Sequence, residues 1–219
     1  MLHIVHKGHS EKVTFPIKRK WITSIATMLR TLFLEENQSC FDIVGFLDKR
    51  FAKLGFDPAF NLEVVADEEL PGRFGETVPS EHVIRIRETI YLKALAGDGF
   101  ARQVMAHELW HYLWHNSETI SYAYVDDSSH IPDEMNPEKQ ADVFAAELLA
   151  PSHEVRGMKI HRISSIYGVT KKTASVQKQI GERAAAHRKS TKQITPKKQI
   201  SSRIKKKRSG RQPNRRRRK

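Results

Sequence analysis

Apolar positions along much of the chain recur every three to four residues, which is the spacing of an amphipathic helix, whereas one stretch alternates with a period of two. The alternating stretch, residues 82–87 (HVIRIR), predicts a strand. The whole pattern predicts helices over 19–34, 41–54, 89–96, 100–115 and 138–151, strands over 61–66, 73–78 and 82–87, and a polar loop over 116–137. Helices on either side of a short group of strands favour a small α+β domain.

The stretch after Pro151 predicts a short helix, a turn at Gly168 and a further helix that begins near Thr170. Glycine suits such a turn, and the hydroxyl of Thr170 can cap the second helix. This order of elements resembles a helix-turn-helix unit, and Lys171, Lys172 and Lys178 would then meet DNA phosphates. The same segment can instead serve packing or contact with a protein partner.

The length of 219 residues suits one domain with appendages. We divide it into an N-terminal extension (1–18), a main domain (19–151), a helical segment (152–181) and a tail (182–219). The chain has one cysteine, which excludes an internal disulfide framework and fits a reducing cytoplasm. No apolar run is long enough to span a membrane and the N-terminus has no signal-peptide pattern, so we expect a cytoplasmic protein without a membrane partner.

Positive charge is concentrated in the tail. Residues 182–219 hold 17 Lys/Arg and one acidic residue, a charge of +16, while the rest holds 21 Lys/Arg and 24 Asp/Glu, or −3, which together give the net +13. A segment of this composition cannot bury apolar surface, so we expect disorder. Its dense basic blocks favour nonspecific binding of DNA or RNA phosphates, and the alternative is a solubilising extension. The candidate residues are Lys205, Lys206, Lys207, Arg208, Arg215, Arg216, Arg217 and Arg218.

The predicted helix over 100–115 (FARQVMAHELWHYLWH) contains the motif H-E-x-x-H, with Asp98 placed to cap its start. Positions i and i+4 share a helix face, so His107 and His111 can offer two imidazole nitrogens to one metal ion. Glu108 lies beside them, where it can accept a proton from a water molecule that the metal activates. The alternative is a helix whose histidines make ordinary hydrogen bonds, and a third ligand would decide between the two.

The predicted helix over 138–151 (EKQADVFAAELLAP) supplies candidates for that third ligand. Glu138 and Asp142 are four residues apart and share one face. A catalytic zinc site has three protein ligands and an open position. Glu138 can be the third ligand, while Asp142 can accept the other ring N–H of His107 or His111. Alone, the two carboxylates would fit a solvated acidic face near a helix N-terminus, which the helix dipole favours.

These two motifs resemble those of the ImmA/IrrE family of metallopeptidases, which are similar to gluzincins. The family's first motif commonly reads AHELGHxxLH, and its second roughly E-x-x-A-[ND]-x-F-A-x-x-L-[LM]-x-P. The matching residues are Ala106, His107, Glu108, Leu109, His111, His115, Glu138, Ala141, Asp142, Phe144, Ala145, Leu148, Leu149 and Pro151. The resemblance implies a zincin-like domain with the H-E-x-x-H helix packed on a short sheet, one Zn²⁺ per chain on His107, His111 and Glu138, and Glu108 as catalytic base.

The chain departs from this pattern at Trp110, where the family usually has glycine, and we expect that side chain to line or narrow the cleft. The resemblance also implies that residues 82–87 form an edge strand that holds extended substrate, the alternative being an internal strand. A side chain of the 116–137 segment, such as Tyr122, Tyr124 or His130, could stabilise the oxyanion.

What the resemblance implies for function is a zinc endopeptidase that cleaves a helix-turn-helix transcriptional repressor in a phage, mobile-element or stress-response setting. The basic tail would concentrate the enzyme on DNA, where that repressor binds. Two alternatives remain: a DNA-associated metalloprotease with a broader substrate range, and a non-proteolytic regulator that binds DNA or a protein partner.

Overall fold

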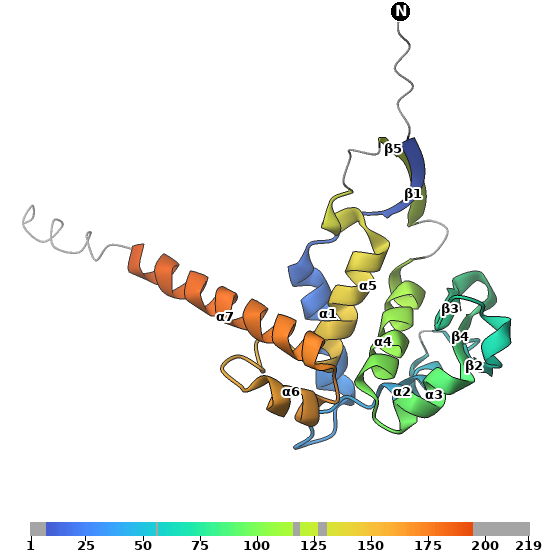
Figure 1. Cartoon of the computed structure of the whole chain (residues 1–219), viewed down its shortest axis with the longest axis horizontal. Coiled ribbons are helices and arrows are strands. Elements are labelled where there is room, and N and C mark those ends of the chain that lie inside the picture. The colour runs from blue at the N-terminus through green and yellow to red at the C-terminus, as the bar shows by residue number, and fades with distance from the viewer. Residues whose placement is uncertain (1–7, 56, 116–118, 127–130, 195–219) are drawn as a thin grey trace, which may run out of the picture. The chain divides into compact units, whose positions relative to one another are not determined.

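The computed structural model describes residues 8–55, 57–115, 119–126 and 131–194, and it divides the chain into two units, Met1–Glu182 and Arg183–Lys219. The described part is a mixture of helices and small sheets, as the pattern of apolar positions predicts (Figure 1). In that part, no helix is long and apolar enough to cross a membrane. The candidate tail residues Lys205–Arg208 and Arg215–Arg218 lie outside the described residues.

Three helices of the first unit form its centre: α1 (Arg19–Phe33), α4 (Gly99–Trp114) and α5 (Pro137–Leu149). Helix α5 packs against both α1 and α4, and Figure 1 shows the three side by side. The apolar side of α1 is buried through Ile22, Ala26 and Leu29, whose spacing is that of one helix face. The core therefore joins the two segments that carry the metal-binding motifs.

Trp110 lies inside this core and does not line the cleft, so the expectation that it would narrow the cleft is wrong. Its side chain is 0% exposed. The indole stacks on Trp114 with a centroid distance of 5.5 Å and contacts Phe144 of α5 at 4.8 Å. Trp110 lies three residues after His107 and one residue before His111, on the side of α4 that faces the interior. It fills space between α4 and α5 instead of lining the cleft.

A three-stranded sheet covers another side of α4. Its order is β2 (Asn61–Val65), β4 (Val83–Arg87), β3 (Gly75–Val78), with β2 parallel and β3 antiparallel to β4. Helix α3 (Glu88–Leu95) follows β4 directly, and α4 contacts both β3 and β4. The strand over 82–87 is therefore the central strand, with both edges paired. Of the two interpretations of residues 82–87, the internal strand is therefore confirmed and the edge strand is wrong, and β3 is the edge strand that contacts α4.

The segment expected as a polar loop contains a strand, β5 (Ile120–Asp126), which pairs antiparallel with β1 (Gly8–Thr14). The register joins Gly8 to Asp126 and Thr14 to Ile120, and Figure 1 shows this ribbon apart from the three-stranded sheet. Part of the expected N-terminal extension thus belongs to a sheet. Local pattern did not predict β1 because GHSEKVT carries little apolar alternation and its partner lies far along the chain.

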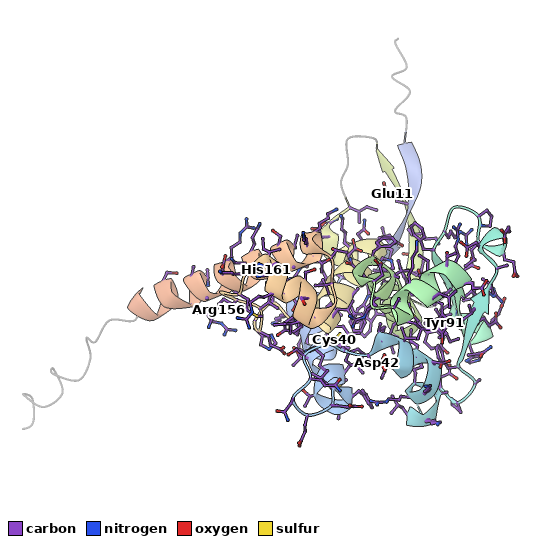
Figure 2. The ribbon with its side chains drawn as sticks, turned by 60° about the horizontal axis from the view of Figure 1, so that its bottom comes forward. Glu11, Cys40, Asp42, Tyr91, Arg156 and His161 are labelled. Atoms are coloured by element: carbon purple, nitrogen blue, oxygen red, sulfur yellow. The ribbon has the colours of Figure 1, made fainter. Side chains whose placement is uncertain are left out.

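The helix expected over 41–54 is divided into three short turns: α2 (Ile43–Gly45), a π-helical turn (Phe46–Arg50) and a 3₁₀ turn (Ala52–Leu54). Asp42, labelled in Figure 2, begins the segment by accepting a hydrogen bond from the Gly45 N–H at 3.0 Å. Phe41, Phe46 and Phe51 recur every five residues, and their rings contact one another at 5.4 and 5.8 Å. Five-residue spacing suits a π turn, which places these rings on one side.

Two further helices follow α5: α6 (Ile160–Tyr167) and α7 (Lys171–Ile194). Gly168 ends α6 with a left-handed backbone (φ 60°), and the Thr170 hydroxyl accepts a hydrogen bond from the Thr173 N–H at 3.1 Å. Helix α7 extends past residue 181, so residues 182–194 are helical where the sequence predicted disorder. Alanines 184–186 have high helix propensity, which accounts for the continuation.

Candidate metal centre

The packing of α4 on α5 brings the two motifs together. His107 and His111 lie one turn apart on α4, and Glu138 lies in the first turn of α5, which Asn136 caps by accepting a hydrogen bond from the Lys139 N–H. Nε2 of His107 is 3.0 Å from Nε2 of His111 and 3.2 Å from Oε2 of Glu138. Nε2 of His111 is 3.6 Å from Oε1 of Glu138. Three residues with metal-ligating atoms therefore share one small volume.

Asp142 lies one turn after Glu138, behind His107. Its Oδ1 is 3.2 Å from Nδ1 of His107, so the Nδ1–H of that ring can donate to the carboxylate. A histidine that donates from Nδ1 has its Nε2 lone pair available on the opposite side, which faces Glu138 and His111. The ligand atoms of the two imidazoles and the Glu138 carboxylate all lie within 4.8 Å of one another. This donor set fits a divalent ion such as zinc.

The electrostatics of these groups in the metal-free protein follow from their proximity. Burial lowers the pKa of His107, but hydrogen bonds with Asp142 and Glu138 outweigh that effect and raise it to about 9. Hydrogen bonds with His107, and secondly with His111, hold the pKa of the Glu138 carboxyl well below its usual range. A metal ion at this position would replace the proton that the ligands otherwise share.

Glu108 lies beside these residues and is held by the edge strand β3. The Thr77 hydroxyl is 2.7 Å from Oε2 of Glu108 and 3.0 Å from its backbone oxygen, so it can donate to the carboxylate. Gly75, on the same strand, allows the approach: a Cβ there would lie 2.9 Å from Cγ of Glu108 and 2.9 Å from Cδ1 of Ile86. The motif did not reveal Thr77 or Gly75, because they come from a strand about thirty residues earlier in the chain.

These side chains line a cleft with a volume of about 580 Å³. One side of the cleft is β3, and Lys12 of β1 and Ile120 of β5 contribute to its lining. A smaller pocket of about 230 Å³ adjoins it and shares Gly75, His107 and Glu108. Phe74 and Phe100, about half exposed, meet edge to face at 5.1 Å in its lining. The centre therefore has an open cleft and an adjacent apolar pocket.

The other candidate site residues are placed less fully. The side chains of Tyr122, Tyr124 and His130 lie outside the described part, as do the basic residues of the tail, so the expectations about them stay predictions. His115 and Gln140 also border the centre: Nδ1 of His115 is 2.8 Å from Nδ1 of His111, and its Nε2 is 3.0 Å from Oε1 of Gln140. The spacing of His115, four residues after His111, is the signal that could have indicated this contact.

Comparison with known families gives a match for this part of the chain. The family model described as IrrE N-terminal-like domain, of peptidase family M78, matches residues 70–179. The matched range includes β3, α4, β5 and α5, and so every residue of the candidate metal centre described above except Lys12 of β1. No curated protein matches the chain.

We expect the stability of the metal-free protein to depend on pH through His107. The pKa of His107 in the folded chain, about 9, lies above the ordinary value of 6.5. Its stabilising contribution to the free energy of unfolding is therefore fully present below pH 6.5 and is lost as the pH rises to 9. In the presence of a chelator, urea denaturation should give a free energy of unfolding that falls over this range in the native protein and falls less in His107→Gln. An equal fall in both proteins would show that His107 is not the group responsible.

Proposed function

This chain belongs to the IrrE N-terminal-like family of peptidases, and on that premise we propose that it is a zinc-dependent endopeptidase that cleaves a helix-turn-helix transcriptional repressor. The observation that carries the proposal is the convergence of His107, His111 and Glu138 beside Glu108 in an open cleft. The donor set supports zinc, and the cleft supports a substrate of extended shape. The repressor, and the phage, mobile-element or stress-response setting, follow from the resemblance described above.

Each residue has a chemical task in this proposal. His107, His111 and Glu138 would hold the zinc ion, which when bound polarises the scissile carbonyl and makes water more acidic. Glu108 accepts a proton from the attacking water molecule as the water oxygen bonds to the carbonyl carbon. Glu108 then delivers that proton to the amine nitrogen as the C–N bond breaks. Thr77, by holding Oε2 of Glu108, orients the carboxylate for both transfers.

The edge strand β3 gives the substrate a place to bind. Its partner β4 occupies one of its edges, and within the described residues no strand pairs with the other. An extended peptide could add to this edge through main-chain hydrogen bonds, next to Glu108. A side chain of that peptide would then enter the adjoining pocket beside Phe74 and Phe100, which favours a large apolar residue near the scissile bond.

The basic tail supports the choice of a DNA-bound substrate. Its charge of +16, from 17 Lys/Arg and one acidic residue over 182–219, suits phosphate neutralisation without sequence recognition. Retention on DNA would raise the local concentration of a bound repressor around the enzyme. The broader DNA-associated protease differs from this proposal by cleaving several unrelated DNA-bound proteins, and the non-proteolytic regulator differs by cleaving none.

Glu108→Gln should lower kcat/KM for peptide hydrolysis by roughly 10²–10⁴, since it removes the proton acceptor, while zinc content stays near that of the native protein. Glu138→Ala should lose zinc and activity together. Peptide cleavage and metal analysis by mass spectrometry measure both, with the exposed Glu88→Gln as a matched control. Full hydrolysis by Glu108→Gln would remove Glu108 from the mechanism, and a zinc-loaded native protein that cleaves no candidate repressor would favour the regulator.

Phe100→Ser should lower kcat/KM roughly tenfold for peptides with an aromatic or large aliphatic residue next to the scissile bond, because the pocket loses apolar contact. Peptides with a small residue at that position should be affected less. A peptide library measures the change in preference, and Leu92→Ser, at an exposed position of α3 away from the cleft, is the control. An unchanged preference would show that the side chain binds elsewhere.

Replacing the eight basic residues 205–208 and 215–218 by glutamine should weaken DNA binding and reduce its dependence on salt, because fewer counterions are released. Hydrolysis of a short peptide should not change, whereas cleavage of a DNA-bound repressor should slow. Lys171→Gln with Lys172→Gln, at the start of α7, is the matched control. Loss of DNA binding in that control alone would assign the contact to the helix-turn-helix-like segment, and undiminished binding by the tail variant would exclude the tail.

A further inference from the structure

A row of hydrogen bonds, partly buried at His111 and buried at Gln140, extends from the metal centre into the core through His115. We propose that Gln140 and His115 are positioning residues that determine which ring nitrogen of His111 carries the proton, and so direct its Nε2 lone pair to the metal position. The inference rests on the metal site of the proposed function. The contacts of Gln140 and His115 assign the donor and the acceptor at each step as far as Nδ1 of His111.

The amide of Gln140 has a fixed orientation. Its Nε2 is 3.1 Å from the backbone oxygen of Phe15 and 2.7 Å from that of Glu134. Carbonyl oxygens only accept, so the two N–H groups of the amide are both used in donating to them. The amide oxygen is left to face His115, and because Gln140 is 1% exposed, water does not compete for these contacts.

This orientation determines the protonation of His115. Oε1 of Gln140 is 3.0 Å from Nε2 of His115 and can only accept, so that Nε2 carries the hydrogen. His115 is 6% exposed and its ring contacts two neutral partners, an amide oxygen and an imidazole, which favours the neutral ring. A neutral ring that is protonated at Nε2 has a lone pair at Nδ1.

The same reasoning then applies to His111. Its Nδ1 is 2.8 Å from the Nδ1 of His115, which accepts, so His111 donates from Nδ1. In the neutral His111 ring, Nε2 consequently has the lone pair, on the side that faces His107 and Glu138. In the other tautomer, two lone pairs would oppose each other at 2.8 Å in the core, and a hydrogen would occupy the ligand position.

The two histidine ligands are therefore prepared by different partners. His107 donates to the Asp142 carboxylate, whose side chain is 56% exposed, whereas His111 donates to a buried neutral imidazole. An outer partner of a metal-bound histidine fixes the ring and contributes to metal affinity. Because the Gln140 amide is anchored by the backbone at Phe15 and Glu134, the His111 arrangement is also tied to segments outside α4 and α5.

The test measures zinc affinity and the tautomer separately. His115→Phe removes the acceptor and should weaken zinc binding, measured by competition with a chromophoric chelator, by roughly 10- to 100-fold. His115→Gln, whose amide oxygen can accept from His111, should recover most of that loss. His161→Phe, at an exposed position, is the matched control. Thermal denaturation identifies any variant that fails to fold, and His115→Gln keeps the test valid if His115→Phe is such a variant.

The second measurement is made on the metal-free protein. Long-range ¹H–¹⁵N correlation spectra of ¹⁵N-histidine-labelled protein should show His111 protonated at Nδ1 in the native chain, and a mixture of tautomers in His115→Phe. Native affinity in His115→Phe, or a native His111 protonated at Nε2 when neutral, would overturn the inference. A native protein that binds no zinc but shows the Nδ1–H tautomer would refute the proposed function and leave the hydrogen-bond relay in place.

Discussion

The contact between α4 and α5 is the constraint on which the rest of the molecule depends. Trp110 and Phe144 fill the space between the two helices and so set the distance between the helix axes. At that distance His107 of α4 and Glu138 of α5 come into contact. A close-packed core resists small displacements, so it can keep the ligand atoms of the two helices in place. The large indole of Trp110 therefore contributes to the support behind the site, and not to its lining.

The centre is built from groups that would repel one another if nothing lay between them. Nε2 atoms of His107 and His111 and the carboxylate of Glu138 converge. The two imidazoles are each supported from behind, His107 by Asp142 and His111 by His115. The raised pKa of His107 and the lowered pKa of Glu138 are the consequence in the metal-free chain. Such a preorganised set of acceptors favours a cation, whose binding relieves the repulsion.

The sequence was most informative where function is local in the chain. Spacing of four residues placed His107 and His111, and then Glu138 and Asp142, on common helix faces, and the family resemblance is confirmed by the match over residues 70–179. Contacts between distant segments were not predictable in this way. Thr77 reaches Glu108 from β3, and the edge position of β3 depends on strand order, which periodicity does not encode.

The ribbon of β1 and β5 has a consequence for the order in which the molecule is assembled. One strand precedes α1 and the other follows α4, so residues 8–14 cannot pair until residues 120–126 have been synthesised. Closing so long a loop is slow relative to forming helices. The wall of the cleft that carries Lys12 and Ile120 is thus among the last parts to form, after the helices that carry the two histidines and Glu138.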